Sequence, residues 1–531
     1  MAFSQPRQPK GEAGLSMSYR LRPYQQEDLD ATIAAFGKHR RVLGVAATGL
    51  GKAVLIQALA KHFADIGKRV LVLADMGVLL DQLANTIRIG TGIDPAVERA
   101  DQRADGDIFR HKSPIVVSTV QTQYQGPDHA MRCLRFKPEQ FGLVVTDEAE
   151  AFLAPKYIAV LKHYLGGNPN CRLFGCTATP MRTDGQGMSK VFQHVAFNRD
   201  IRWGVENGYL VPPRQGEVHV HADWSTLRTT DGDYSDSSLS TVLSDMSEQA
   251  SLQFAGGIVD QAGEKRSIVV LPKVRNAVAT AQFINAVRPR SARAIYGTMD
   301  DDEVGEVLAE HKAGRFQFLC SVNMLTKGYD DPGVHNIFMC RPTKSRRLYT
   351  QVLGRGARLS DPTIGGMATI EERKSAIAES DKPHMTMFNM VGICPTVKDL
   401  NIVDALAGHD IEPSARALAS KRVAEQPERD VLEQIAEAIA EDAAAREALD
   451  AARRERIMVE AEVRANVTNL FGVSSDSDIA LRPRRGTQLP RGTYWALRNG
   501  GVANNVIDRL TVYEAGQMAR ELTRRRKVQL G

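Results

Sequence analysis

The sequence predicts an α/β protein in which two parallel-sheet domains follow one another and a helical region ends the chain. Three observations predict this fold. Short apolar runs alternate with helical segments before residue 400, the runs fall into two successive sets, and a long stretch without Gly or Pro follows them. Alternating strands and helices are typical of parallel sheets that are covered by helices on both faces.

The first set of apolar runs contains five segments rich in Val, Ile or Leu and bounded by polar or turn residues. Runs of this kind are expected to form buried parallel strands. They are Val42–Ala46, Arg69–Leu73, Ile115–Ser118, Leu143–Thr146 and Leu173–Cys176. We expect a first domain at residues 18–203, after a polar tail at residues 1–17 that lacks the apolar core of a signal peptide.

The second set predicts a second sheet in residues 216–398. Its strands are expected at Ser267–Leu271, Ala292–Tyr296, Phe316–Ser321, Asn336–Met339 and Met385–Asn389. Residues 204–215 contain Gly208 and the pair Pro212–Pro213 and are expected to link the two domains.

The C-terminal end divides by charge into an acidic helical region at residues 399–480 and a basic helical tail at residues 481–531. The acidic region has 18 acidic and 9 basic side chains, whereas the tail has 11 basic and 3 acidic ones. Such a switch indicates separate modules. Glu428–Val463 is dense in Ala, Glu and Arg and predicts about 50 Å of helix. Its apolar positions keep no strict heptad, which favours one solvated helix or two shorter ones over a coiled coil.

Composition excludes several classes of protein. In 531 residues, 25% are charged and 43% hydrophobic, which is a normal globular balance and excludes a disordered or collagen-like chain. The sequence has no apolar run of 18 residues, so no membrane partner is expected. The six cysteines form no CxxC pair, which argues against a zinc ribbon and favours reduced thiols. A net charge of +5 permits a polyanionic partner without requiring one.

A Gly-rich turn follows the first predicted strand. Ala46-Ala47-Thr48-Gly49-Leu50-Gly51-Lys52-Ala53 leads into an apolar-periodic helix. Backbone N–H groups of such a turn wrap a phosphate, and Lys52 would reach the outer phosphates. An ordinary strand–helix turn with a surface lysine is the alternative, but GxGK with these flanks favours phosphate binding. Compared with G-x4-G-K-[ST], Ala46 replaces a glycine, and Ala53 removes the hydroxyl that normally ligates Mg²⁺.

The strand Leu143–Thr146 ends in adjacent acids, Asp147 and Glu148, with Glu150 close behind. In a phosphate-loop protein the first acid holds Mg²⁺ and the second can polarise the attacking water. Acids that are merely solvated at a strand end are the alternative. The phosphate loop upstream favours the functional interpretation.

Seven motifs in order resemble those of the superfamily 2 DEAD/DEAH-box helicases, and among these the bacterial DNA-repair and bacteriophage members. The resemblance covers roughly residues 20–395. The matching segments are the adenine-reading element Leu21–Gln25, motif I at Thr48–Ala53, motif II at Asp147–Glu150, motif III at Thr177–Pro180, the linker sequence Asn207–Pro213, motif V at Leu325–Asp330 and motif VI at Gln351–Arg358.

The resemblance implies two RecA-like domains that bind ATP and Mg²⁺ between them. The catalytic residues that it implies are Lys52, Asp147, Glu148, Arg355 and Arg358, with Asp147 also as the metal ligand. The nucleotide-binding residues that it implies are Arg22, Gln25, Thr48, Gly49, Leu50, Gly51, Lys52, Ala53, Gly328, Asp330 and Gln351. The two arginines would stabilise charge on the transferring phosphoryl group.

The resemblance also implies contacts to a nucleic-acid strand, mostly to its phosphates, so sequence specificity is not expected. These contacts would come from motif Ia at residues 74–82, from Thr119 and Gln121, and from Thr326 and Lys327 of motif V. Thr177 and Thr179 of motif III would couple hydrolysis to domain movement.

Five positions depart from the family pattern. Ala53 replaces Ser or Thr, and Glu150 replaces the His or Asp that links motif II to the other domain. Asp75 stands in motif Ia where a basic or His residue is usual, Lys327 replaces Glu, and Asn389 replaces Asp. The cysteine-rich zinc tail of many repair helicases does not occur in this chain. The departures leave open a helicase fold with slow or absent hydrolysis.

The basic tail interleaves arginines with aromatic residues. Arg491 and Trp495 are the residues that we expect to contact nucleic acid there, because basic groups attract phosphates and aromatic rings stack on bases. A small helical domain with Trp495 and Leu497 in its core is the alternative, and the sequence does not decide between the two.

Two hypotheses about function follow from the sequence. The first is an ATP-dependent nucleic-acid helicase or translocase, acting on DNA rather than RNA in replication, recombination or repair, in the cytoplasm of a bacterium or phage-infected cell. The second is a helicase-fold nucleic-acid-binding or scaffold protein that does not hydrolyse ATP, which Ala53 and Glu150 favour. A nuclease-coupled restriction motor would need an acid cluster that we do not recognise here. The acidic helical region is a candidate surface for a protein partner.

Overall fold

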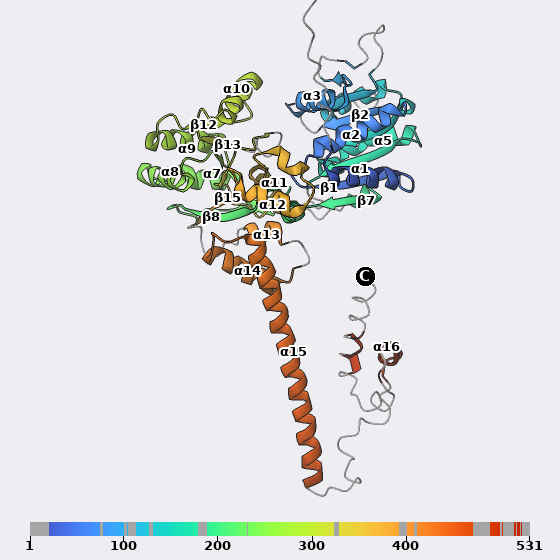
Figure 1. Cartoon of the computed structure of the whole chain (residues 1–531), viewed down its shortest axis with the longest axis vertical. Coiled ribbons are helices and arrows are strands. Elements are labelled where there is room, and N and C mark those ends of the chain that lie inside the picture. The colour runs from blue at the N-terminus through green and yellow to red at the C-terminus, as the bar shows by residue number, and fades with distance from the viewer. Residues whose placement is uncertain are drawn as a thin grey trace, which may run out of the picture. The chain divides into compact units, whose positions relative to one another are not determined.

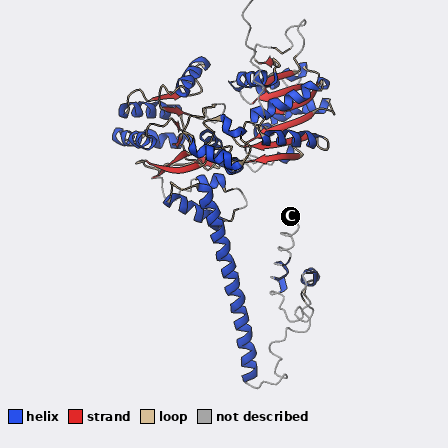
Figure 2. Cartoon of the chain, in the orientation of Figure 1, coloured by secondary structure: helices blue, strands red, loops and turns tan. Residues whose placement is uncertain are grey.

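The first sheet has seven strands, all parallel, and helices cover both of its faces (Figures 1 and 2). Its order is β3-β4-β2-β5-β6-β1-β7. The strands are β1 (Arg41–Ala46), β2 (Arg69–Ala74), β3 (Ala96–Glu98), β4 (Ile115–Thr119), β5 (Phe141–Thr146), β6 (Arg172–Thr177) and β7 (His194–Arg199). The helices of this lobe are α1 (Pro23–Phe36), α2 (Lys52–Asp65), α3 (Val78–Thr91), α4 (Val120–Tyr124), α5 (Pro155–Gly167) and α6 (Ile201–Glu206).

The computed structural model describes the following residues: 21–74, 78–99, 103–104, 113–126, 131–178, 188–230, 232–322, 329–391, 401–407, 411–470, 489–499, 502, 515–516, 518–520 and 522.

The strands of the first sheet that were predicted from apolar runs are buried on both faces. In β2, Val70 and Val72 belong to the core cluster on one face, while Leu71 and Leu73 belong to the cluster on the other. This alternation follows from the two-residue period of a strand. A sheet buried on both faces needs helices on both, which is why the sequence alternates strand and helix.

The second sheet has six strands, again all parallel, in the order β12-β13-β11-β14-β15-β8. They are β8 (Pro213–His219), β11 (Ser267–Val270), β12 (Ala292–Ile295), β13 (Phe318–Ser321), β14 (Asn336–Met339) and β15 (Met385–Val391). The helices of this lobe are α7 (Asp236–Ser244), α8 (Glu248–Ala262), α9 (Val274–Val287), α10 (Asp301–Lys312), α11 (Arg346–Gly356) and α12 (Ile370–Glu379). A short antiparallel pair, β9 (Thr229–Thr230) with β10 (Asp233–Tyr234), precedes α7.

All ten predicted strands occur. In the two large sheets, β3, β7 and β8 had no apolar run to mark them, and each lies at the edge of its sheet. An edge strand is half solvated, so it carries polar residues; in β7 only Phe197 is buried. β8 begins at Pro213, inside the stretch expected as linker, and pairs with β15 along its whole length. The segment that leaves the first lobe therefore completes the second sheet.

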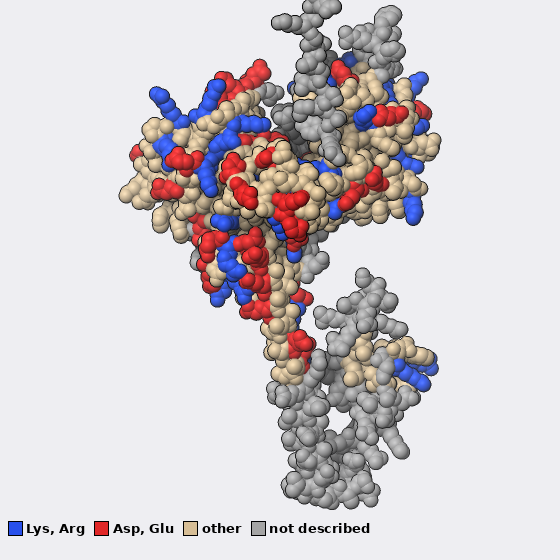
Figure 3. All heavy atoms as spheres, viewed as in Figure 1, with Lys and Arg blue, Asp and Glu red and all other residues tan. Residues whose placement is uncertain are grey.

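Between residues 401 and 470 the described residues form α13 (Ile402–Leu406), α14 (Pro413–Glu425) and α15 (Val431–Leu470). Val431, Ile435 and Ala438 of α15 join the core cluster of the lobes, and the side chains described from Ala443 to Arg453 are exposed. α15 is one continuous helix of 40 residues. Acidic and basic side chains mix over α14 and the start of α15 (Figure 3), where Arg429 pairs with Glu437 at 2.7 Å.

The chain divides into two compact units, residues 1–442 and 443–531. Within the second unit, α16 (Arg491–Asn499) packs Leu497 against Ala515 and Ala519. Among the described residues, no helix has both the length and the apolar character that a bilayer crossing requires.

Phe174 is expected to be a main contributor to the stability of the first lobe. It lies fully buried at the centre of β6, with its ring 6.4 Å from that of Phe197. Phe174→Ala should cost about 3–5 kcal/mol through lost burial and a cavity and lower the melting temperature by roughly 10 °C. Differential scanning calorimetry measures this. Leu449→Ala, at a side chain that is 70% exposed, serves as the control, and an equal loss in both variants would contradict the assigned core.

Candidate active site

The carboxyl ends of the strands in the first sheet face a cavity of about 580 Å³ that both lobes line. Parallel sheets place their ligand sites at this edge because all strands end there. The residues that line the cavity include Gly49, Gly51, Lys52, Asp147 and Glu148 from the first lobe, and Asp330, Arg355 and Arg358 from the second. Residues far apart in the sequence thus meet in one place, as the motif order predicts.

The turn between β1 and α2 requires its two glycines. Gly49 has φ of 96° and Gly51 has φ of 73°, a left-handed conformation that glycine adopts without cost. A Cβ at Gly49 would lie 2.9 Å from Leu210 Cδ2. Gly51 is the N-cap of α2 and Lys52 is its first residue, so the N-terminus of the helix faces the cavity with its partial positive charge. This geometry suits a bound phosphate.

Side chains in the first turn of α1 donate hydrogen bonds to this loop. The Tyr24 hydroxyl donates to the carbonyl oxygen of Leu50 at 2.6 Å, and Gln25 Nε2 lies 3.4 Å from the same oxygen. Gln25 Oε1 accepts a hydrogen bond from the backbone N–H of Arg22 at 3.0 Å. Arg22 and Gln25 both line the cavity, whereas Leu50 is buried and contributes its carbonyl. Gln25 therefore supports the loop as well as facing the cavity.

The two acids that follow β5 lie beside Lys52. Lys52 Nζ is 3.2 Å from Glu148 Oε1, and both side chains are about nine-tenths buried. Glu148 has φ of 51°, and a side chain in this left-handed region costs about 1–2 kcal/mol. Such strain persists where the surrounding structure fixes it, commonly at functional sites.

Charge interactions set the ionisation of these groups. Burial acts to lower the pKa of Lys52, but the carboxylates of Glu148 and Asp147 outweigh it and hold that pKa above its ordinary value. Burial, together with repulsion from Glu148, raises the pKa of Asp147. Glu148 has a lowered pKa because attraction to Lys52 overcomes its burial. The two acids therefore differ. Glu148 stays ionised against Lys52, whereas Asp147 forms no ion pair within the part of the chain that the structure describes.

The two acids are better suited to bind a divalent cation than the residues of the phosphate loop are. Asp147 and Glu148 both line the cavity, and Glu148 Oε2 is buried without a hydrogen-bond partner among the described residues. A buried acceptor of this kind is available to a ligand. Ala53 also lines the cavity, but its methyl group offers no oxygen. Carboxylate oxygens would therefore have to hold Mg²⁺ without the usual hydroxyl.

The two arginines of α11 reach the cavity from the second lobe. Arg355 and Arg358 each donate to the carbonyl oxygen of Tyr329, at 2.9 and 3.2 Å, and Arg358 also pairs with Asp330. Burial and repulsion from Arg358 lower the pKa of Arg355 to about 10. α11 approaches so closely that a Cβ at Gly354 would lie 2.6 Å from Thr48 Cβ. The helix that carries the arginines thus packs directly on the phosphate loop.

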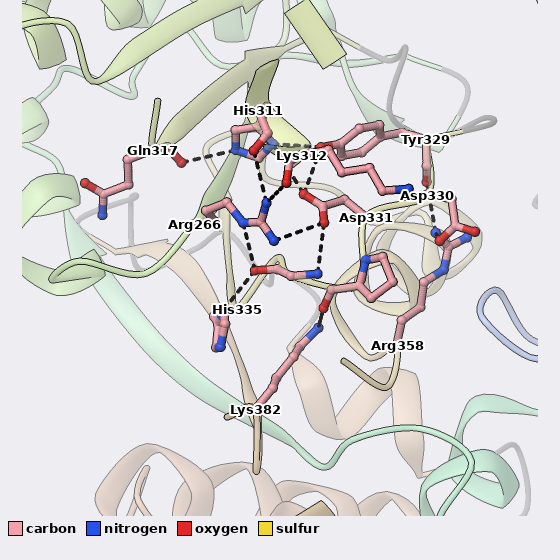
Figure 4. A network of polar contacts seen from close by, with 12 residues as sticks. Arg266, His311, Lys312, Gln317, Tyr329, Asp330, Asp331, His335, Arg358 and Lys382 are labelled. Carbon is pink, nitrogen blue, oxygen red and sulfur yellow. Dashed lines mark hydrogen bonds and ion pairs between the residues drawn. The ribbon is translucent and has the colours of Figure 1, made fainter. Parts of the chain in front are cut away.

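A buried polar network fixes the segment to which the two arginines donate (Figure 4). Asp331 accepts from the Tyr329 hydroxyl at 3.0 Å and pairs with Arg266 at 3.3 Å. His311, fully buried, lies 2.7 Å from the same hydroxyl. Lys382 Nζ donates to the carbonyl oxygen of Pro332 at 2.7 Å. The main chain that presents the Tyr329 carbonyl is therefore held from several sides.

The other residues predicted for nucleotide or nucleic-acid binding lie in different parts of the structure, and some do not line the cavity. Gln351 is buried in α11 and does not line the cavity. Thr119 is buried and caps α4 by accepting from the backbone N–H of Thr122, which gives it a structural role. Gln121 is exposed and lies 3.4 Å from the Tyr157 hydroxyl. Trp495 is 60% exposed on α16, which also carries Arg491. Thr179, Thr326, Lys327 and Gly328, and Asp75 of motif Ia, lie outside the described residues.

Motif II connects to motif III and to the second lobe through Glu150. The Thr177 hydroxyl donates to Glu150 Oε2 at 2.6 Å, and Arg347 lies 3.0 Å from Glu150 Oε1. Glu150 therefore makes the link between the lobes that its departure from the family pattern placed in doubt. Nothing in the sequence indicated a role for Arg347, although this residue lies on α11 four residues before Gln351 and eight before Arg355, on the same helix face.

Aromatic residues form the wall of the cavity next to Arg22. The ring of Tyr209, which lines the cavity, lies 4.4 Å from that of Tyr24 and under the guanidinium of Arg373 at 4.3 Å. Trp203 stacks on Tyr209 with an interplanar angle of 16°. Their clustering had no sequence signal beyond the linker motif that contains Tyr209.

Two family comparisons match the two lobes in turn. Residues 18–182 match the family described as type III restriction enzyme, res subunit, and residues 250–360 match the helicase conserved C-terminal domain. The first match includes Lys52, Asp147 and Glu148, and the second includes Arg355 and Arg358. Each of the two lobes that line the cavity therefore contains a segment that matches a known family.

Several curated proteins are similar along much of this chain. A Saccharomyces cerevisiae protein named as the ATP-dependent helicase IRC3 is 24% identical over 351 residues, covering 64% of this chain and 49% of that protein. A 51.5 kDa protein of a Lactococcus phage is 24% identical over 317 residues, covering 58% and 61%. The EcoAI endonuclease subunit of an Escherichia coli type I restriction enzyme is 22% identical over 376 residues, covering 64% and 44%. The chain spans about half the length of the curated relatives it matches.

Solved structures share the fold of this chain. LlaBIII, described as an ATP-dependent type ISP restriction-modification enzyme bound to DNA, gives a TM-score of 0.53 at 17% identity, over 76% of this chain and 30% of that one. A fragment named as the HsdR subunit of a type I restriction enzyme from Vibrio vulnificus gives 0.50 at 18% identity, over 73% and 65%. The two tandem RecA-like domains predicted from the sequence are confirmed.

A methyl group at Gly354 should separate α11 from the phosphate loop. The added Cβ in Gly354→Ala would overlap Thr48, and overpacking of this kind costs about 1–3 kcal/mol. We expect nucleotide affinity to fall about tenfold, which corresponds to roughly 1.4 kcal/mol. Fluorescence titration with a labelled ATP analogue measures this. Gly305→Ala, where the added Cβ meets nothing within 4 Å, is the matched control, and unchanged affinity in Gly354→Ala would contradict the close packing.

Lys382 should make the stability of the second lobe depend on pH. Burial lowers its pKa from 10.5 to about 7. Between these two values the unfolded chain holds a proton that the folded chain releases, so stability rises with pH, by at most about 1.4 kcal/mol per pH unit. Lys382→Met removes this dependence. Melting temperatures from pH 7 to 9.5 should therefore rise more in the parent than in the variant, and exposed Lys421→Met should follow the parent. Parallel curves for the parent and Lys382→Met would refute the assignment.

Proposed function

We propose that this chain is a member of helicase superfamily 2 and an ATP-driven helicase or translocase that acts on nucleic acid, on DNA rather than RNA. One observation carries the proposal: the cavity places Lys52, Asp147 and Glu148 of one lobe opposite Arg355 and Arg358 of the other. Neither lobe alone contains both sets. A site that is complete only when two lobes meet can tie a chemical step to their relative movement.

The proposed roles follow from the positions of the side chains. Lys52 and the N-terminus of α2 bind the outer phosphates, and Asp147 holds Mg²⁺. Glu148 orients and polarises the attacking water, a role that suits a carboxylate kept ionised by Lys52. Arg355 and Arg358 stabilise the negative charge that develops on the transferring group. ATP, when bound, supplies the phosphoanhydride bond whose hydrolysis is the source of free energy.

The base of the nucleotide is assigned to the part of the cavity beside Tyr209. Arg22, Gln25 and Tyr209 line the cavity, and Tyr24 and Trp203 support the aromatic ring of Tyr209. A planar base stacks favourably on such a surface. We propose that Arg22 and Gln25 contact its polar edge, as the resemblance implies.

DNA is the proposed substrate because the relatives include enzymes whose names refer to restriction, and because LlaBIII is described as bound to DNA. Strand contacts are assigned to motif V and to the exposed Gln121, with Arg491 and Trp495 of α16 as an accessory contact. A process in replication, recombination or repair and a protein partner at the acidic helical region are part of the same proposal.

The competing proposal is a helicase-fold protein that binds nucleic acid without turnover. Ala53 favours it, because the cavity offers no hydroxyl where a phosphate loop normally supplies one to Mg²⁺. The contact of Glu150 with Arg347 of the second lobe supports the hydrolysing enzyme instead, because it links motif II to that lobe.

ATP hydrolysis with and without single-stranded DNA distinguishes the two proposals. We expect DNA to stimulate turnover and Lys52→Ala to reduce it by at least about 100-fold, since a phosphate-binding cation is lost from a buried site. Lys61→Ala, on the exposed face of the same helix, is the matched control. Ala53→Thr should preserve or raise the rate by restoring a metal ligand.

A parent chain without turnover that gains activity through Ala53→Thr would support the non-hydrolysing protein instead. Single-stranded RNA of the same length, tested in parallel, decides the substrate: equal or greater stimulation by RNA would contradict the preference for DNA.

A further inference from the structure

Glu150 joins three parts of the structure at one buried carboxylate. It follows β5 in the sequence, it accepts a hydrogen bond from Thr177 at the end of β6, and it pairs with Arg347 of α11 in the second lobe. The Glu150 side chain has no exposed surface, and that of Arg347 is 31% exposed. The proposed mechanism has no role for Arg347, which does not line the cavity.

α11 is a rigid connection between this carboxylate and the cavity. Arg347 and Arg355 are eight residues apart, which is about 12 Å along a helix. Near the Arg355 end, Gly354 packs on Thr48 of the phosphate loop. The helix thus touches the first lobe at two points, and any slide or rotation at Arg347 moves Arg355 as well.

The buried carboxylate also depends on Arg347 electrostatically. Burial and the nearby Glu148 raise the pKa of Glu150 to about 7, and Arg347 opposes this shift. Removing one partner of a buried ion pair is costly, because the other is left as an uncompensated charge. Separation of the lobes would take Arg347 away from Glu150, so this contact favours the arrangement in which the lobes meet.

We propose that Arg347 is a positioning residue that couples the two lobes: its ion pair with Glu150 sets α11, and with it Arg355 and Arg358, against the acids of the first lobe. This inference rests on the proposed function for its effect on hydrolysis. Its effect on lobe closure does not require turnover and is tested separately.

The first test compares turnover with substrate affinity. Arg347→Ala should lower the DNA-stimulated kcat about 10- to 100-fold, because the arginines are then misplaced relative to the reacting group, with little change in KM for ATP. Arg347→Lys, which keeps the charge, should recover part of the loss. Arg315→Ala, which breaks an exposed pair with Glu310 in the same lobe, should leave kcat unchanged.

The second test asks whether Arg347 acts through Glu150. If it does, the double variant Glu150→Gln/Arg347→Ala should be no slower than the slower single variant, since the effects of a contacting pair are not additive. Losses that multiply would show that Arg347 acts elsewhere and would overturn the inference.

The third test needs no hydrolysis. The affinity for oligothymidine is measured with and without AMP-PNP, and the nucleotide-dependent change in the parent should largely disappear in Arg347→Ala. A parent that shows this change but no turnover would refute the proposed function and retain the coupling. A parent whose affinity does not respond to AMP-PNP, or an Arg347→Ala variant that responds fully, would overturn the coupling.

Discussion

The packing of α11 on the phosphate loop is the contact on which the rest of the site depends. Gly354 allows the helix backbone to reach Thr48, and no other residue would fit without moving one lobe. This approach brings Arg355 and Arg358 into the same cavity as Lys52, Asp147 and Glu148. Buried charges of both signs then offset one another, which lowers the cost of removing each from water.

The buried charges are arranged so that each has a defined orientation. Glu148 pairs with Lys52, and the Tyr329 carbonyl accepts from both arginines. The network centred on Asp331 holds the segment that contains this carbonyl, through the Tyr329 hydroxyl and Arg266 (Figure 4). Groups that are oriented before a ligand arrives need no reorganisation when it does, and this preorganisation is the main source of electrostatic catalysis.

The candidate site was predictable to the extent that its residues lie in contiguous motifs. The cavity is lined by Lys52, Asp147, Glu148, Arg355 and Arg358. These residues could be predicted because the motifs that contain them, such as the phosphate loop and the strand-end acid pair, are local patterns. Arg347 and Asp331 were not found. Each acts through a partner that is distant in sequence, Glu150 for Arg347 and Arg266 for Asp331. No local spacing records such a pairing. Thr119 illustrates the reverse case, since the same hydroxyl that suits a phosphate contact also caps α4.

The sequence by itself determined the two parallel sheets, because strands buried on both faces must be apolar along their whole length, and it determined the order of the motifs. The tertiary structure decided what lies at the edges. β3, β7 and β8 have one neighbour each, so pairing and not composition makes them strands. It also decided the partner of Glu150: the sequence shows only an unexpected acid, and the fold brings Arg347 to it. Burial leaves a local trace in the sequence, whereas a contact between lobes depends on how two complete domains pack.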